Sequence, residues 1–188
     1  PETARLQYKI IIDGHWMLDP SNQRHVLEGF GVNSEFWMPM YADRSFQTST
    51  SEITDKLWAI QIWSNYYNSR RDIYFSAPDL NDLDFNQDLP IWYFQDGREC
   101  LELGRFNRVF ENLRKTHTIE PIVNVYVNPN DRMSEYSTDK KYDRFFADEV
   151  FPAVYHELKK RGYNISNNPK KHCISGASLG GLVSTHIA

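Results

Sequence analysis

The sequence predicts an α/β fold, in which a mostly parallel sheet carries helices on both faces and follows a smaller, all-β region. Two observations favour this fold. From residue 57 onward, short apolar runs typical of buried strands alternate with patterns typical of amphipathic helices. Before residue 45, strand-like runs are separated only by turn-forming residues. A hydrophobic content of 40 %, with 14 % aromatic residues, is sufficient for a packed core.

The all-β region is predicted to span residues 1–44. Residues 6–12 have the composition of a strand, and the Asp-Gly pair that follows is a hairpin-type turn signal. A second strand-like run occupies residues 34–38 and stops at a proline. The next segment is rich in Ser and Thr, so we expect a linker at residues 45–56.

Residues 57–188 are predicted to form the α/β domain. Five strand-like runs are expected, at residues 57–63, 70–78, 89–97, 119–129 and 171–175. Helical patterns cover residues 102–115 and 142–158, and a last helix follows the final strand. In the second helix, apolar spacings of three and four residues define one buried face. Pro152 lies inside that helix, so we expect a kink or two abutting helices there.

Composition and charge exclude several function classes. The net charge is −4 and the 21 Lys and Arg residues are scattered, so we expect no nucleic-acid partner. No apolar run is long enough to span a membrane, and no signal peptide is visible. Cys100 and Cys173 match no metal or redox spacing, so we expect two buried free thiols and no metal site, with a single disulfide left open. The cellular compartment is left open as well.

The most informative motif is Gly176-Ala177-Ser178-Leu179-Gly180, a G-x-S-x-G pattern between a strand-like run and a helix-compatible segment. In a nucleophile turn, a strand must reverse into a helix within a few residues. Glycines two positions before and after the serine leave room for this crowded backbone. The side chain of Ser178 would then present its Oγ, and the N–H of Leu179 would face a developing oxyanion.

Three other interpretations compete with this one. The segment could be a glycine-rich strand-to-helix connection without chemistry. A phosphate-binding P-loop is excluded because no Gly-Lys-Ser/Thr follows. A dinucleotide-binding turn would need a glycine where Leu182 stands, and it normally follows the first strand of its domain.

No residue that follows Ser178 in this chain is a good candidate for the catalytic base or the catalytic acid. The ten residues after Ser178 contain no carboxylate, and His186 would lie about 12 Å away along a helix. A general base must lie roughly 3 Å from the serine. Earlier histidines would require another chain order; they are His15, His25, His117, His156 and His172. We therefore expect that the chain is truncated, that the acid and the base lie beyond Ala188, and that this segment alone is nearly inactive.

Residues 57–188 resemble the front part of the enterochelin-esterase-like branch of the α/β-hydrolases. Four stretches carry the likeness in the family's order: RRDIYFSAP, LPIWYFQDGRE, VYVNPNDRMSEYSTDKKYDRFFADEVFP and ISGASLGGL. The third is the most distinctive, with an Asp-Arg-x-x-Glu-Tyr turn followed by a helix. The resemblance implies an α/β-hydrolase fold, truncated here after the nucleophile turn. It also implies a serine carboxylic-ester hydrolase that uses no metal and no organic cofactor.

The resemblance implies roles only where residues match the family. Ser178 matches the nucleophile, and the N–H of Leu179 matches one oxyanion donor. The other donor matches an N–H just after Asp96-Gly97, which we expect to be that of Arg98, with that of Gly97 as the second candidate. We interpret the Asp96 side chain as structural.

The resemblance constrains the substrate less. Arg132 and Glu135 are candidates for lining the substrate pocket, unless they form an internal pair that pins their loop. Siderophore trilactones and acetyl or feruloyl esters of polysaccharides all fit the family, and acyl transfer to another alcohol would use the same residues. The alternative to an esterase is a catalytically dead, hydrolase-like carbohydrate-binding or scaffold protein.

The first 44 residues resemble the C-terminal half of an immunoglobulin-like β-sandwich module of the glycogen-binding type. The matching pattern is Tyr8-Lys9, Asp13-Gly14-x-Trp16, Asp19-Pro20 and Gly31-x-Asn33-Ser34. This resemblance implies a partial β-sandwich whose first strands lie upstream of Pro1. Trp16 could stack on a sugar ring, or it could pack within the sandwich or against the following domain. A carbohydrate ester is therefore one candidate substrate.

Overall fold

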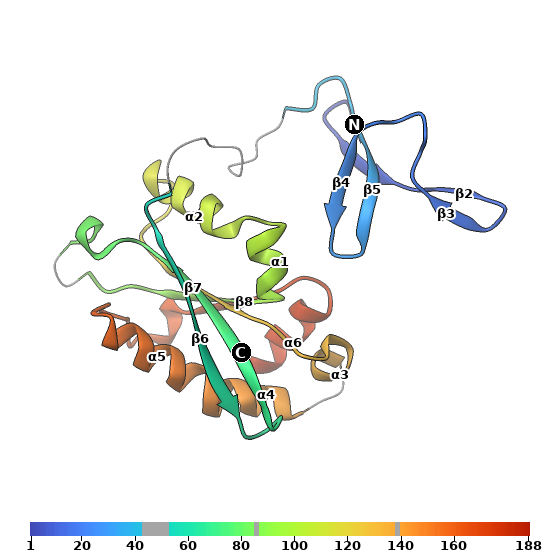
Figure 1. Cartoon of the computed structure of the whole chain (residues 1–188). Coiled ribbons are helices and arrows are strands. Elements are labelled where there is room, and N and C mark those ends of the chain that lie inside the picture. Colours follow the sequence, from blue (N-terminus) through green and yellow to red (C-terminus); the bar gives the residue numbers. More distant parts are fainter. Residues whose placement is uncertain (43–52, 85–86, 138–139) are drawn as a thin grey trace. The chain divides into compact units, whose positions relative to one another are not determined.

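The computed structural model describes residues 1–42, 53–84, 87–137 and 140–188. The chain divides into two compact units, Pro1–Ser45 and Phe46–Ala188 (Figure 1). Most of the linker predicted at residues 45–56 lies outside the described residues.

The first unit contains two small antiparallel sheets. The strands are β1 (Arg5–Tyr8), β2 (Ile10–Ile12), β3 (His15–Met17), β4 (His25–Glu28) and β5 (Gly31–Trp37). One sheet has the order β1-β5-β4, and the other is the hairpin β2-β3. Asp13 and Gly14, between β2 and β3, have φ angles of 51° and 83°. Both angles are positive, as a two-residue type I′ turn requires, so the predicted hairpin turn is confirmed.

The strands of the first unit differ from the prediction in two respects. The single strand expected at residues 6–12 is divided into β1 and β2, which belong to different sheets. The strand expected at residues 34–38 begins earlier, at Gly31, and β3 and β4 are additional to the predicted strands. Short strands such as β3, with three residues, carry too few positions for a periodic pattern to be recognised.

The second unit is built on a five-stranded sheet. Its strands are β6 (Lys56–Ser64), β7 (Ser69–Ala77), β8 (Ile91–Gln95), β9 (Val123–Val127) and β10 (Cys173–Ser175). Their spatial order is β10-β8-β9-β7-β6. β8 is parallel to β9 and to β10, whereas β7 is antiparallel to both β9 and β6. Only β7 therefore opposes the other four strands, and the mostly parallel sheet predicted from the sequence is confirmed.

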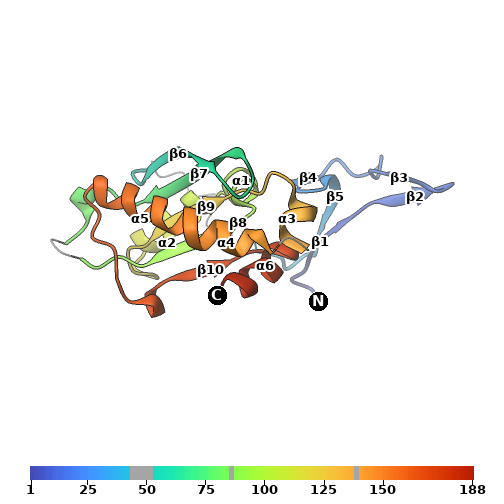
Figure 2. The ribbon, with the colours of Figure 1, turned by 90° about the horizontal axis from the view of Figure 1, so that it is seen from below.

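Helices cover both faces of this sheet. The α-helices of the described residues are α1 (Gly97–Glu102), α2 (Phe106–Lys115), α3 (Arg132–Ser137), α4 (Lys141–Phe145), α5 (Phe151–Lys160) and α6 (Leu179–Ile187). The Phe94 ring lies 5.6 Å from that of Phe110 in α2, and the Tyr93 ring lies 5.0 Å from that of Phe151 in α5. Neighbouring residues of a strand point to opposite faces, so α2 covers one face and α5 the other. Figure 2, which views the molecule from below, places α4 and α5 in front of the strands.

The helix predicted at residues 102–115 is two helices. α1 ends at Glu102 and α2 begins at Phe106. Between them Arg105 has a φ of 51°, which is incompatible with a continuous right-handed helix. Gly104, which lies in the break, has a low helix propensity. The helix α3 is also new, since the sequence indicated only a turn there.

The helix predicted at residues 142–158 is present but changes its winding. α4 and α5 are joined by a π-helical turn, Phe146–Val150. Pro152 follows directly, at the start of α5, and the winding of the helix changes immediately before it. The two abutting helices that Pro152 predicted are therefore connected by a widened turn. No helix within the described ranges is long and apolar enough to cross a membrane.

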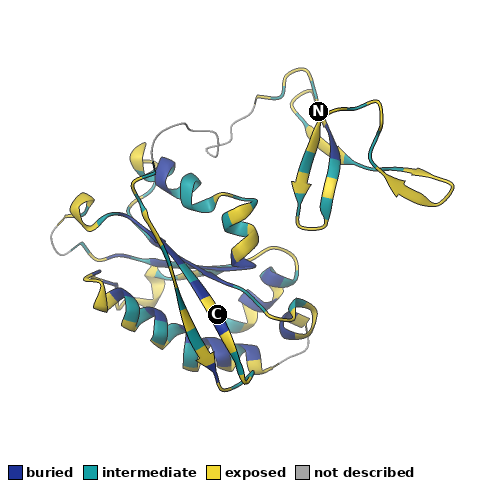
Figure 3. Ribbon diagram, in the orientation of Figure 1, coloured by how far each residue is buried: buried dark blue, intermediate teal, exposed yellow. Residues whose placement is uncertain are grey.

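The core of the second unit follows the predicted helical face. Figure 3 shows buried positions on the strands and on the sides of the helices that face them. Six side chains of that face are fully buried: Tyr142, Phe145, Phe146, Val150, Val154 and Leu158. They pack with the apolar residues that β7, β8 and β9 direct to the same side of the sheet.

The last residues of the predicted linker belong to the second unit. Thr54 donates from its N–H and from its hydroxyl to Glu111 of α2, over 2.6 and 2.9 Å. Asp55 forms an ion pair with Arg114, also in α2. These contacts fasten the chain to α2 immediately before β6 begins.

Candidate active site

The strand-to-helix turn predicted around Ser178 is strongly distorted. Ser178 lies between β10 and α6, with φ 55° and ψ −121°. Residues other than glycine rarely adopt this conformation, and such strain is concentrated at functional sites. The Ser178 side chain is exposed, so the nucleophile candidate is accessible.

The two glycines that flank the serine at a distance of two residues are required by space. A Cβ on Gly176 would lie 2.5 Å from the carbonyl carbon of Gly180. A Cβ on Gly180 would lie 2.9 Å from Oδ2 of Asp96 and 3.2 Å from Cβ of Gln95. The turn therefore folds onto itself and onto the end of β8, which is the crowding that the motif predicts.

The N–H of Leu179 is available as a hydrogen-bond donor. Leu179 is the first residue of α6, where helical N–H groups lack an intrahelical acceptor. Among the described residues, no acceptor faces this N–H. The positive end of the α6 dipole also lies there, and it favours a negative charge next to Ser178.

The second predicted oxyanion donor requires a correction. The N–H of Arg98 donates to Oδ1 of Asn128 over 2.7 Å, and the Arg98 side chain pairs with Glu102. Arg98 is therefore already engaged, and it is not free to bind an oxyanion in this structure. The N–H of Gly97 has no acceptor within the described part of the chain. Of the two candidates, only Gly97, which is buried at the start of α1, has its N–H unengaged among the described residues.

Arg132 and Glu135 do not form the internal pair that the sequence suggested. Glu135 is 4 % exposed, and its carboxylate accepts two hydrogen bonds of 2.9 Å from Arg71, a buried residue of β7. It also accepts the N–H groups of Asn130 and Asp131 at 3.1 Å. Glu135 therefore fixes α3 from inside the fold, and its carboxylate is occupied by these bonds.

Arg132 lies beside the nucleophile turn. Its Nε and Nη2 each donate to the Asp96 carboxylate over 2.8 Å. Nη2 also donates to the carbonyl oxygen of Ala177 over 3.3 Å. The hydrogen bonds to Asp96 raise the pKa of Arg132 above its usual value, and the side chain remains 30 % exposed. Asp96 is thus structural, as expected, and it links Arg132 to the end of β8.

A buried network supports the Asp-Gly turn after β8, and the sequence alone did not reveal it. The N–H of Asp96 donates to the hydroxyl of Tyr136 over 3.1 Å. The hydroxyls of Tyr136 and Tyr142 both donate to Oε1 of Gln95, over 3.2 and 2.8 Å. Burial raises the pKa of both tyrosines, so their hydroxyls stay protonated as donors. The tyrosines belong to α3 and α4, and only the folded chain brings them to Gln95.

The two histidines nearest to Ser178 in the sequence, His172 and His186, are not placed to act as its base. Nδ1 of His172 accepts the N–H of Ile91 over 3.2 Å, and its Nε2 lies 2.9 Å from the carbonyl oxygen of Ser166. Both nitrogens of His172 are therefore engaged. His186 lies in the last turn of α6, at the opposite end of that helix from Ser178.

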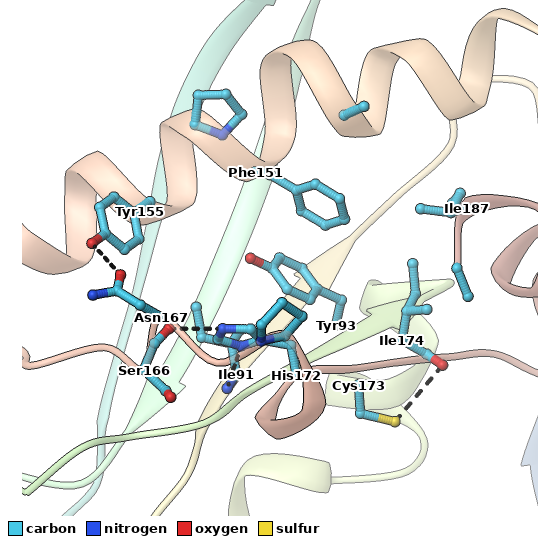
Figure 4. A pocket seen from close by; sticks show the side chains of 14 residues that line it. Ile91, Tyr93, Phe151, Tyr155, Ser166, Asn167, His172, Cys173, Ile174 and Ile187 are labelled. Atoms are coloured by element: carbon cyan, nitrogen blue, oxygen red, sulfur yellow. Dashed lines mark hydrogen bonds between the residues drawn. The ribbon is translucent and has the colours of Figure 1, made fainter.

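A cavity of about 630 Å³ lies away from the nucleophile. Figure 4 shows Tyr93, Ile174, Phe151 and Ile187 around it, on β8, β10, α5 and α6. β10 pairs only with β8 within the described chain, so this apolar cavity follows a sheet edge. Because Ser178 does not line the cavity, it is not the candidate active site.

The two cysteines are free, but they are not both buried. Cys100 is half-buried and Cys173 is exposed. Burial raises the pKa of the Cys100 thiol to about 12, which keeps it protonated and unreactive at neutral pH. The prediction of two buried thiols is therefore wrong for Cys173, on β10, and only partly met by the half-buried Cys100.

Trp16 does not pack inside its own unit. It lies on β3, directly opposite Ile11 of β2, and 70 % of its surface is exposed. The described residues of the first unit therefore leave most of the Trp16 side chain uncovered.

A comparison with protein families decides the family. The family described as "Putative esterase" matches residues 64–188, which is more than half of the chain. The chain belongs to this esterase family. No curated protein sequence matches it.

Solved structures of esterases share the fold of this family member. Enterochelin esterase from Shigella flexneri is 20 % identical, with a TM-score of 0.69 over 92 % of this chain and 42 % of its own. The Shigella flexneri enterobactin esterase in the presence of enterobactin is 18 % identical, with a TM-score of 0.72 over 89 % and 42 %. A ferulic acid esterase from Anaeromyces mucronatus is 18 % identical, with a TM-score of 0.56 over 78 % and 58 %.

The two kinds of esterase match different shares of the chain. Residues 46–188 make up about three quarters of the 188 residues, so a match over 92 % includes part of the first unit. The ferulic acid esterase match, over 78 %, has about the extent of the second unit alone. The chain itself spans about two fifths of the length of the enterochelin esterase structures.

Proposed function

We propose that this chain carries the nucleophile and the oxyanion donors of a serine carboxylic-ester hydrolase. The observation that carries the proposal is the strained backbone of Ser178, φ 55° and ψ −121°, in a G-x-S-x-G turn of an esterase-family chain. A glycine-rich connection without chemistry would not need a serine in this conformation, because glycine adopts it without strain.

The reaction follows from the groups around Ser178. Its Oγ attacks the ester carbonyl carbon and passes its proton to a base, and the carbonyl oxygen becomes an oxyanion. The N–H groups of Leu179 and Gly97 hold that oxyanion. The bond to the alcohol then breaks, and the alcohol leaves with the proton from the base. Water, activated by the same base, attacks the acyl-enzyme, releases the carboxylic acid product and restores the serine.

The base and the acid are proposed to lie in a part of the protein outside this chain. The engaged nitrogens of His172 and the position of His186 support this proposal. In α/β-hydrolases the acid and then the histidine follow the serine in the sequence. The enterochelin esterase structures are long enough to hold these further residues, because this chain spans only 42 % of them.

An enterochelin-type ester is the substrate class that we favour over feruloyl esters. The similarity to enterochelin esterases extends into the first unit, whereas that to the ferulic acid esterase has about the extent of the second unit. A small-molecule ester of this kind, a siderophore trilactone, is therefore the first substrate to assay. Acyl transfer to an alcohol would use the same residues.

Labelling with a fluorophosphonate tests the proposed nucleophile. The full-length gene product that contains this chain is treated with the reagent, digested and mapped by mass spectrometry. We expect one modified peptide, carrying the label on Ser178, and no label on urea-unfolded protein. A folded full-length protein that remains unlabelled would contradict the proposal, and would favour the catalytically dead scaffold.

Carbohydrate binding by the first unit is a second candidate function. It is favoured by the 70 % exposure of Trp16, whose ring could stack on a sugar, and by the resemblance of residues 1–44 to part of a glycogen-binding β-sandwich. We expect the full-length protein to be retarded on an immobilised α-glucan column, and Trp16→Ala to elute without retardation. Wild-type protein that is not retarded would exclude this function.

A further inference from the structure

One arginine bonds to both of the turns from which the proposed oxyanion donors come. Asp96 immediately precedes Gly97, and Ala177 immediately precedes Ser178 and Leu179. Arg132 donates to the carboxylate of the first turn and to the Ala177 carbonyl of the second. We propose that Arg132 is a positioning residue, which sets the separation of the Gly97 and Leu179 N–H groups. This inference rests on the proposed esterase function.

The geometry of the hydrogen bonds that Arg132 donates supports a fixed separation between the Gly97 and Leu179 N–H groups. The two 2.8 Å bonds from Nε and Nη2 to Asp96 form a fork that allows one orientation of the guanidinium. With that orientation set, Nη2 has only one place from which to reach the Ala177 oxygen at 3.3 Å. Asp96 also packs against the second turn, because a Cβ on Gly180 would lie 2.9 Å from its Oδ2. The pair thus lies wedged between the two turns.

Arg132 is itself held by a rigid helix. It begins α3, and one turn later Glu135 binds the buried Arg71. The next residue, Tyr136, accepts the N–H of Asp96 through its hydroxyl. α3 is therefore fastened both to β7 and to the Asp-Gly turn. A side chain supported in this way can keep two loops within the narrow tolerance that an oxyanion site needs.

The charge of Arg132 has a second consequence. The Asp96 carboxylate is 10 % exposed and lies against the first turn of α6, close to the proposed oxyanion site. An unpaired carboxylate there would repel the negative charge that develops in the transition state. By pairing with Asp96, Arg132 allows a buried carboxylate to brace the turn without opposing the reaction.

Direct substrate binding by Arg132 predicts a different result. Its side chain is 30 % exposed, so contact with a substrate is sterically open. Loss of a contact made equally in the ground state and the transition state raises KM and leaves kcat unchanged. Loss of the oxyanion geometry lowers kcat and leaves KM nearly unchanged, because the oxyanion exists only in the transition state.

The experiment uses the full-length gene product with p-nitrophenyl acetate and with a fluorophosphonate. For Arg132→Gln, we expect kcat to fall about 100-fold with little change in KM, and Ser178 labelling to slow in proportion. Arg132→Lys keeps the charge but cannot form the fork, so its kcat should lie between those of Arg132→Gln and wild type. Asp96→Asn added to Arg132→Gln should raise kcat, because it removes the unpaired carboxylate. Arg161→Gln is the control: it removes the ion pair with Glu157 at the C-terminal end of α5 and the contact of Arg161 with the Trp58 ring.

Each outcome of these measurements either supports or overturns the positioning role of Arg132. All rates are referred to folded protein, measured by circular dichroism, so that loss of fold is separated from loss of geometry. If Arg132→Gln does not fold, Arg132→Lys carries the test. A raised KM with unchanged kcat, or a kcat equal to that of wild type, would overturn the positioning role while leaving the esterase intact. Wild-type protein that neither hydrolyses the ester nor takes up the label would overturn the proposed function itself.

Discussion

Full-length protein that carries Ser178→Gly is expected to hydrolyse no ester and to unfold at a higher urea concentration than wild type. The loss of activity follows from the missing Oγ. The gain in stability follows from the backbone, since Ser178 has φ 55° and ψ −121°. Strain of this kind costs of order 1–3 kcal/mol for a residue with a Cβ. Glycine relieves it but adds disorder to the unfolded chain, so a net gain of about 1 kcal/mol is expected.

Two further variants separate the side chain from the backbone. Ser178→Ala removes the Oγ but keeps the Cβ, so it should be inactive without becoming more stable. Thr185→Gly, on the exposed side of α6, has no positive φ to relieve, and it should lose about 0.3 kcal/mol, the difference in helix propensity between Thr and Gly. The free energy of unfolding is measured by urea denaturation. A Ser178→Gly protein no more stable than Ser178→Ala would show that the turn stores no strain.

Removing one partner of the buried Arg71–Glu135 pair is expected to cause the largest loss of stability. The two side chains are 1 % and 4 % exposed, and they share two hydrogen bonds of 2.9 Å. Glu135→Gln leaves the guanidinium without its counter-charge in the interior. Such uncompensated burial typically costs about 3–5 kcal/mol. Urea denaturation followed by tryptophan fluorescence measures the loss.

The double variant Arg71→Met with Glu135→Leu tests the reason for that loss. It removes both charges and fills the space with apolar groups, so it should recover most of the stability. Lys171→Ala breaks an exposed pair with Asp88, in which the side chains are 47 % and 44 % exposed, and should change stability by less than about 1 kcal/mol. Equal losses in the single and double variants would mean that the geometry of the pair, rather than its charge balance, stabilises α3.

Local pattern in the sequence was enough for the five strands of the second unit, the buried helical face and the serine turn. The six apolar residues spaced along residues 142–158 are all fully buried, because spacing on a helix is set within a few residues. The same holds for the Asp13-Gly14 hairpin turn. The G-x-S-x-G motif is local only in part. Gly176 relieves crowding against Gly180, inside the motif, whereas Gly180 leaves room for Asp96 and Gln95 at the end of β8.

The partners of several charged side chains and N–H groups depend on contacts between distant parts of the chain, which local sequence pattern does not reveal. Arg71 and Glu135 are 64 residues apart, Asp96 and Arg132 are 36 apart, and Arg98 and Asn128 are 30 apart. These pairs exist because the order β10-β8-β9-β7 brings the ends of distant strands, and the helices that follow them, to one edge of the sheet. A charged residue or an N–H group in the sequence does not reveal which of many partners it will meet. Only the folded chain therefore showed that Glu135 is interior, that Arg98 is engaged and that Arg132 joins the two turns beside Ser178.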